Sequence, residues 1–174
     1  MTDRSAPESL RLVQELVNTL DVETGEDALD TREGLARFGV SARERGELRE
    51  LRELLRAACL AHAGTPIPPG AGHALARHLG RAWLALDVGR DGDAALRPAE
   101  GLDGVAELTA RIAAGVAVAA VDGSWRRLKA CAAGDCQWVY YDRSPAGRSR
   151  WCTMAVCGSR AKMRGYRARR RPRG

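Results

Sequence analysis

The stretch Cys131-Ala-Ala-Gly-Asp-Cys136, followed fifteen residues later by Cys152-Thr-Met-Ala-Val-Cys157, decides the fold of the last part of this 174-residue chain. Four thiolates from two such close pairs can form a tetrahedron around Zn2+. Two disulfides would also use four cysteines. The chain opens without an apolar signal segment, however, so we expect a reducing compartment, where disulfides are rare. The predicted ligands of a structural zinc ion are Cys131, Cys136, Cys152 and Cys157.

The residues around these cysteines predict the shape of the site. Gly134 allows the tight turn that a zinc knuckle requires. Residues 137–142 have the composition of a strand, residues 143–148 that of a turn, and residues 150–152 are expected to return as a second short strand. Cys157 is expected in the first turn of a final helix. This order predicts a treble-clef-like finger that depends on zinc for much of its folding energy, because its aliphatic residues are few.

The final helix is expected to be strongly basic. The residues predicted to bind nucleic acid are Arg160, Lys162, Arg164, Arg167, Arg169, Arg170 and Arg171. Four of these arginines follow the spacing of one helix face, which can lie along a phosphate backbone or enter a groove. Nucleic acid is the expected partner, because arginine also makes bidentate contacts with guanine, and these residues leave DNA and RNA both open. A solvated helix, an RNA-binding or protein-binding module, and docking onto acidic residues of the chain's own N-terminal part are the alternatives.

The charge of the chain divides near Trp125. The whole sequence has 28 Lys and Arg against 22 Asp and Glu, a net charge of +6. Residues 1–124 contain 14 arginines and 20 acidic residues, a net charge of −6, whereas residues 125–174 carry +12. We therefore predict an N-terminal domain over residues 1–124 and a finger over residues 125–174.

The N-terminal part is expected to be helical, so that the whole chain is mostly α with a small β content (α+β). Apolar residues recur at steps of three and four, which predicts helices over residues 8–20, 41–63, 72–85 and 104–121, with a short helix over 31–38. Trp83 and Leu86 are expected to face the core beside the third long helix. Asp91-Gly92 between two alternating runs predicts a β-hairpin. Cys59 is expected to be a buried hydrophobic residue.

The predicted helical domain shows little catalytic chemistry. It contains no phosphate-binding loop, nucleophile elbow or paired acid–base groups, so we expect no enzyme. Asn18 and Thr19 end the first helix, where they can cap or cross-link the fold or line a ligand pocket. An enzyme with its pocket near Asn18 is the remaining alternative of another class.

Two segments resemble known families. The run from Leu128 to Lys162, with its four cysteines, Trp138, Tyr141-Asp142-Arg143-Ser144 and Cys157-Gly-Ser159-Arg160, closely resembles the CGNR zinc finger. Leu16-Val-Asn-Thr-Leu-Asp21 resembles the opening of the ABATE domain that precedes such fingers. Ser159 stands where the family has Asn, which would weaken a contact made by that Asn. The resemblance implies a stress-induced bacterial transcription regulator, with a sensor or regulatory domain and a DNA-binding finger.

The remaining expectations concern location and assembly. The longest apolar run, residues 112–121, is too short to span a bilayer, so we expect a cytoplasmic protein without a membrane partner. An unidentified small molecule or stress signal is a possible ligand of the N-terminal domain. A single finger on DNA would gain from a homodimer, although the sequence leaves the oligomeric state open.

Overall fold

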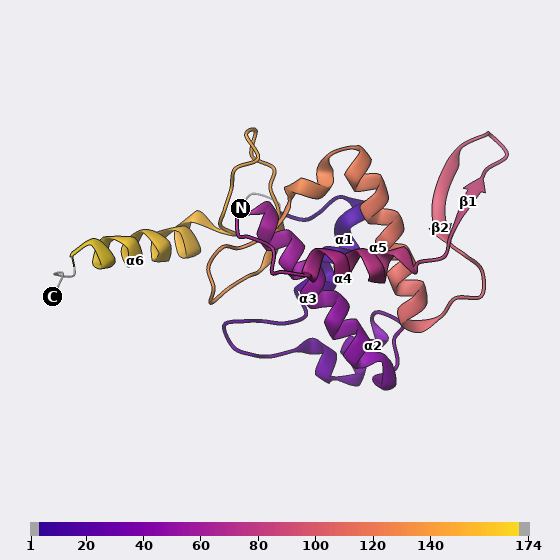
Figure 1. Cartoon of the computed structure of the whole chain (residues 1–174), viewed down its shortest axis with the longest axis horizontal. Helices are drawn as coiled ribbons and strands as arrows, with labels where there is room; N and C mark the ends of the chain where they lie inside the picture. Colours follow the sequence, from indigo (N-terminus) through magenta and orange to yellow (C-terminus); the bar gives the residue numbers. More distant parts are fainter. Residues whose placement is uncertain (1–3, 171–174) are drawn as a thin grey trace.

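The computed structural model describes residues 4–170 and is mostly helical, as predicted (Figure 1). The helices are α1 (Glu8–Val17), α2 (Arg32–Ala36), α3 (Arg45–His62), α4 (Ala71–Gly80), α5 (Gly104–Val121) and α6 (Ser159–Arg170). The strands are β1 (Leu84–Val88), β2 (Ala94–Pro98), β3 (Leu128–Ala130) and β4 (Val139–Tyr141). They form two antiparallel two-stranded sheets, β1–β2 and β3–β4.

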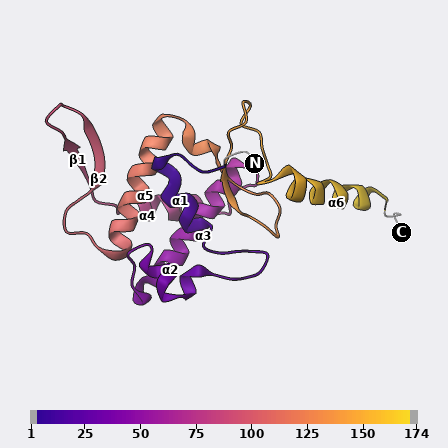
Figure 2. The ribbon, with the colours of Figure 1, turned by 180° about the vertical axis from the view of Figure 1, so that it is seen from behind.

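The helices gather in the middle of the molecule, and two elements project from it (Figures 1 and 2). The β1–β2 hairpin extends from one end and α6 from the opposite end. The core lies between α1, α3 and α5, whose apolar stripes face one another. The largest fully buried aliphatic side chains include Leu10, Leu16, Leu29, Leu48, Leu51, Leu55, Leu108 and Ile112.

Two small residues show how tightly this core packs. Gly115 lies where α5 meets the start of α1, and a Cβ at this position would collide with the carbonyl oxygen of Ser9. Cys59 of α3 is completely buried, and burial raises the pKa of its thiol to about 12. Its position confirms the prediction of a small buried hydrophobic residue.

Helix α5 is, within residues 4–170, the one helix with the length and apolar composition of a membrane span. The core helices of soluble proteins often share these properties. Val105, Leu108 and Ile112 of α5 are buried against other helices, and the helix contacts both α1 and α4. Toward the end of the helix, however, Val118 and Val121 are exposed, so burial in the core accounts for only part of its apolar composition.

The predicted inward positions of Trp83 and Leu86 are wrong. Helix α4 ends at Gly80, and the chain then leaves the core to form β1. The side chains of Trp83 and Leu86 are 73% and 65% exposed, respectively. The predicted hairpin is confirmed, with Leu86 opposite Leu96, and strand pairing replaces the helical periodicity that would have turned these residues inward.

The predicted strand at residues 150–152 is also wrong. Strand β4 pairs instead with β3, which precedes the first cysteine. Leu128, Ala130 and Val139 of this sheet are completely buried in the same hydrophobic core as α1 and α3. The pairing follows from this burial, because β3 gains both ladder hydrogen bonds and contact with α3. The domain division near Trp125 remains a prediction, and the apolar core is continuous across it.

Candidate metal centre and basic surface

The four predicted cysteine ligands meet at one point. Their Sγ atoms all lie within 4.8 Å of one another. Cys131 follows β3, and its backbone N–H donates to the carbonyl of Trp138 at 2.9 Å. The chain then turns so that the N–H groups of Cys136 and Gln137 both donate to the carbonyl of Ala133. This knuckle, in which Gln137 takes a left-handed conformation, returns the second thiol to the first.

The sulfur spacing fits zinc. Cys152 Sγ lies 3.7 Å from Cys136 Sγ and 3.6 Å from Cys157 Sγ. A tetrahedral ion with Zn–S bonds of about 2.3 Å would separate its ligands by about 3.8 Å. A disulfide would require about 2.05 Å, so the thiols are spaced as ligands. The protein thus has a structural Zn2+ site, consistent with the predicted cofactor.

The crowded thiols also need a cation. The hydrogen bond with Cys152 lowers the pKa of Cys131 to about 5, so one thiolate forms readily. Burial raises the pKa of Cys157 to about 12, and the hydrogen bond with Cys131 raises the pKa of Cys152. Both shifts disfavour the thiolate forms that bind metal. A bound divalent cation reverses this preference, because it stabilises each thiolate directly. Filling all four positions with thiolate leaves none for water, so the ion supports the fold and does no hydrolytic chemistry.

The second pair of cysteines fixes the start of α6. Cys157 lies in a π-helical turn, Met154–Gly158, that leads directly into the helix. This placement agrees with the expectation that Cys152 precedes the helix and Cys157 begins it. A Cβ at Gly158 would meet Met154 Sδ, which belongs to a flexible side chain that is 55% exposed and can move aside. The zinc site is therefore the point from which α6 leaves the body.

A buried ion pair beside the zinc site was not predicted from the sequence. Lys129 of β3 and Asp142 after β4 are only 4% and 1% exposed, and Lys129 Nζ lies 2.8 Å from Asp142 Oδ2. Burial alone would raise the pKa of Asp142, but hydrogen bonds from Lys129, Ser144 and Ser149 outweigh it and lower the pKa to about 2. A lysine within one short strand and an aspartate directly after its partner were the available signal, since charged residues are buried mainly when paired.

The first helix is joined to β4 by side-chain amides. Asn18 accepts a hydrogen bond from the N–H of Val139 at 2.7 Å and donates to its carbonyl at 2.9 Å. Gln14, one turn earlier, donates to the same carbonyl at 3.1 Å. Asn18 therefore cross-links the helical body and the finger like an additional strand residue.

Helix α3 makes a second set of such bonds. Arg56, almost completely buried, donates to the carbonyls of Val17 at 2.8 Å and Gln137 at 3.2 Å. Burial lowers the pKa of His62, whose Nδ1 lies 2.8 Å from the carbonyl of Leu128. The neutral ring must donate through Nδ1, because a carbonyl only accepts. Side chains of the helical body thus bind backbone groups on both strands of the finger, at Leu128 of β3 and at Val139 of β4.

Asn18 and Thr19 also border two shallow hollows. These hollows, of about 590 and 620 Å3, are both lined by the partly exposed Trp138. Both amide atoms of Asn18 already bind Val139, and Thr19 Oγ1 donates to the carbonyl of Leu16. A ligand pocket at these two residues stays a prediction.

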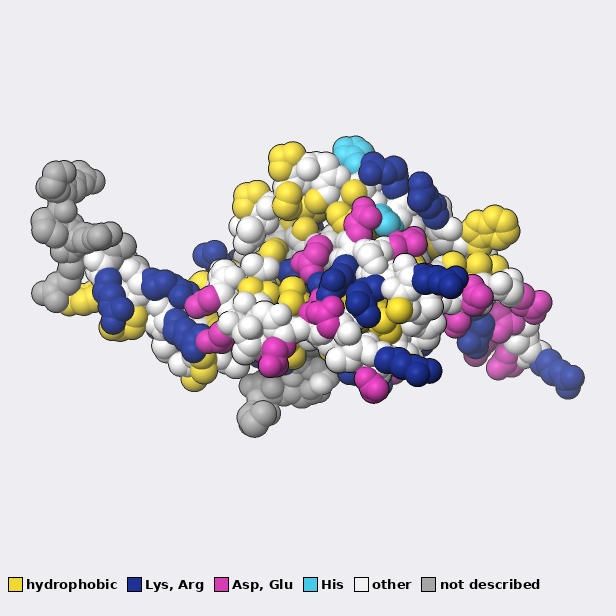
Figure 3. Space-filling view, turned by 90° about the horizontal axis from the view of Figure 1, so that it is seen from below, with side chains coloured by type: hydrophobic (Ala, Val, Ile, Leu, Met, Phe, Trp, Pro, Cys, Tyr) yellow, Lys and Arg dark blue, Asp and Glu magenta, His cyan; other side chains and the backbone are white. Residues whose placement is uncertain are grey.

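The predicted nucleic-acid residues lie on different sides of α6. Arg160 forms an ion pair with Glu23 at 3.1 Å, and Arg164 pairs with Asp135 at 3.2 Å. The Arg160–Glu23 contact corresponds to the alternative in which the helix docks onto acidic residues of the N-terminal part, whereas Asp135 belongs to the finger itself. Figure 3 shows acidic side chains beside basic ones where α6 meets the body. Within the described residues, no ion pair is found for Lys162 or Arg167. The side chains of Arg169 and Arg170 and all of Arg171 lie outside the described part.

Comparison with known families accounts for nearly the whole chain. Residues 10–124 match the ABATE model, described as "Putative stress-induced transcription regulator". Residues 127–170 match the model of the CGNR zinc finger. A search of curated proteins returned no match.

Proposed function

Since the chain belongs to the ABATE family and ends in a CGNR zinc finger, we propose that it is a non-enzymatic transcription regulator that binds duplex DNA through α6. The observation that carries this proposal is the anchoring of a basic, solvent-exposed helix directly to a four-thiolate zinc site. The major groove of B-DNA is wide enough to admit an α-helix, and the arginines of such a helix can contact phosphates and guanine edges. The zinc ion fixes the direction in which this helix leaves the body.

The ion pairs at Arg160 and Arg164 do not oppose this function. All four side chains of these pairs are substantially exposed, so each pair contributes little free energy and is screened by salt. DNA phosphates can therefore replace Glu23 and Asp135 as partners. The same exchange supplies a route by which a change in the helical body, such as binding of a stress signal, would alter DNA affinity.

The remaining parts of the proposal concern context. The regulator acts in the cytoplasm, where reducing conditions preserve the thiolates. A homodimer would place two fingers on a repeated half-site and increase specificity. The dimer is tested by the mass of the protein–DNA complex and by the symmetry of the sequences that it selects.

The central test is selection of bound sequences from random duplex DNA, followed by titration of the selected site. We expect binding that weakens steeply as salt rises, because phosphate contacts release counterions. Replacing Arg164 and Arg167 with alanine should weaken binding at fixed salt. The matched control replaces Arg77 and Arg81, two exposed arginines of the body, and should leave affinity unchanged. Equal affinity of both variants, or a preference for structured RNA over every duplex, would contradict the proposal.

A further inference from the structure

The loop between β4 and Cys152 carries a second group of exposed basic side chains. Arg143, Arg148 and Arg150 are all exposed on this basic loop, defined as residues 143–150. We propose that the basic loop and Lys162 of α6 together form a phosphate-binding surface that contacts the backbone of the same DNA duplex. This inference rests on the proposed function and adds a contact surface on the side of α6 opposite Arg164.

The buried ion pair fixes the backbone of the basic loop. Lys129 Nζ donates to the carbonyls of Gly147 and Ser149 in addition to Asp142. Asp142 in turn accepts hydrogen bonds from the N–H groups of Ser144 at 3.0 Å and Ser149 at 2.9 Å. Both ends of the loop are thus bound to charges that are themselves buried. A buried pair is costly to desolvate, and here its hydrogen bonds are used to hold a solvent-exposed loop in one conformation.

The basic loop and α6 are attached to the same zinc site. The N–H of Ala132, next to the first cysteine, donates to the carbonyl of Arg150 at 2.9 Å. The loop ends two residues later at Cys152, and the π-helical turn containing Cys157 then begins α6. The basic loop leads into Cys152 and α6 follows Cys157, so the metal site sets the relative position of their basic side chains. A surface fixed in this way can match the regular spacing of phosphates with little loss of entropy.

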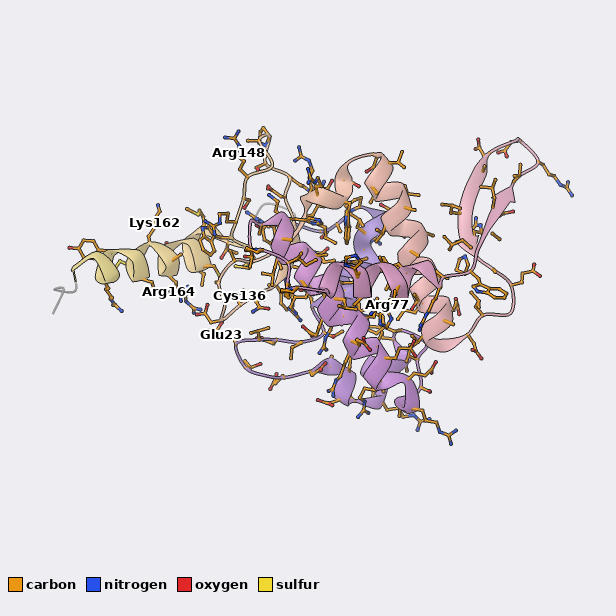
Figure 4. The ribbon with its side chains drawn as sticks, viewed as in Figure 1. Glu23, Arg77, Cys136, Arg148, Lys162 and Arg164 are labelled. Atoms are coloured by element: carbon orange, nitrogen blue, oxygen red, sulfur yellow. The ribbon has the colours of Figure 1, made fainter. Side chains whose placement is uncertain are left out.

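Three charges on this side, those of Arg148, Arg150 and Lys162, are available to a ligand. In Figure 4, Arg148 and Lys162 point toward the same side of the view, whereas Arg164 points toward the opposite side, near Cys136 and Glu23. Arg148 and Lys162 have no ion pair within residues 4–170. Arg150 lies with its guanidinium 5.6 Å from the centre of the Trp151 ring, a contact that keeps its charge. Phosphates can therefore bind here without first displacing a carboxylate.

The test compares two triple variants of the full chain on the selected duplex. One variant combines Arg148→Ala, Arg150→Ala and Lys162→Ala. The control combines Arg77→Ala, Arg81→Ala and Arg90→Ala, which remove the same charge from exposed positions in the body. Affinity is measured from 50 to 300 mM salt by fluorescence anisotropy. Zinc content and circular dichroism confirm that both variants keep the finger and the helices.

Log affinity falls as log salt rises, and we expect this negative slope to be shallower by about 3 in the surface variant. Each of the three lost phosphate contacts removes about 0.9 from its magnitude. At 0.1 M salt this corresponds to a loss of roughly several hundred-fold in affinity, spread evenly over different DNA sequences. If the wild type binds duplex DNA and both triple variants keep its slope, the surface is not a phosphate site, while the proposed function stands. If the wild type binds no duplex, both fail. A loss seen only with structured RNA would overturn the DNA surface in favour of an RNA surface.

Discussion

The helical body buries complete leucine and valine side chains between α1, α3 and α5, whereas the finger encloses only a small cluster around its thiols. That second cluster contains Cys131, Ala133, Tyr140 and Cys157 as its buried members. The finger adds the zinc site, the Lys129–Asp142 pair and the bonds from Asn18 and Arg56. The body also has a buried ion pair, Arg52 with Asp27 at 2.7 Å, but there it accompanies a large apolar core. The finger, which has little apolar surface to bury, therefore depends on metal ligation and buried polar contacts for its stability.

Metal removal should separate the two regions most clearly. A strong chelator is expected to unfold the knuckle, the basic loop and α6, since structural zinc contributes about 10–16 kcal/mol in small fingers. The helices α1, α3 and α5 should keep their protection, because their core contains no ligand. Hydrogen exchange followed by mass spectrometry, with metal analysis, measures both regions at once. Uniform loss of protection, or retention of the knuckle without metal, would break the comparison.

Removing one charge of the buried pair should come next in size. Lys129→Met leaves Asp142 buried without its cation and is expected to lower the free energy of unfolding by about 3–5 kcal/mol. Arg126→Met, which removes a neighbouring positive charge outside the pair, is the control. Urea denaturation of the zinc-loaded proteins at pH 7 gives the values. A loss no greater than that of the control would mean that the pair does not support the finger.

The same pair gives a dependence on pH. The pKa of Asp142 is about 2 in the folded protein, below its usual 3.8, so the stability it contributes is complete above pH 3.8 and is lost as the pH falls toward 2. In Lys129→Met the buried carboxylate should have a raised pKa. The difference in stability between wild type and variant should therefore shrink as the pH falls from 7, as Asp142 of the variant becomes protonated. Urea denaturation at several pH values, with zinc content checked at each, measures this difference; a constant gap would argue against the ion pair.

An apolar truncation distinguishes the body from its projecting hairpin. Leu51→Ala in α3 should cost about 2–5 kcal/mol, because its side chain is completely buried and leaves a cavity. Leu86→Ala on β1 is the matched control, since the same atoms are removed from a side chain that is 65% exposed. Its effect should be within about 0.5 kcal/mol. Thermal denaturation of the two variants decides whether the hairpin belongs to the core.

The smallest expected effect concerns the junction. Asn18→Ala removes both of its hydrogen bonds to Val139 and should cost about 1–3 kcal/mol, since it leaves the N–H of Val139 without this partner. Arg11→Ala on the exposed face of α1 is the control. Hydrogen exchange at the amide of Val139 is the direct readout. Exchange as slow as in the wild type would show that Asn18 does not attach the finger to the body.

The helices and the metal site could be predicted because their signals are local. Buried residues such as Leu10 and Val13 recur at helical spacing, and four cysteines in two close pairs have few other uses in a reducing compartment. The strand pairing was mistaken because β3 is only three residues long, too short for its alternation to stand out. Its partner was decided by burial against α3, a contact distant in sequence.

The sequence by itself determined the mostly helical class, the four-cysteine cluster and the basic composition of α6. Only the tertiary structure decided that Trp83 faces solvent, that Lys129 and Asp142 form a buried pair, and that Arg160 of α6 reaches Glu23. The physical reason is that periodicity and composition act within one segment. Burial, ion pairing and the direction of a helix depend instead on which distant segments the folded core brings together.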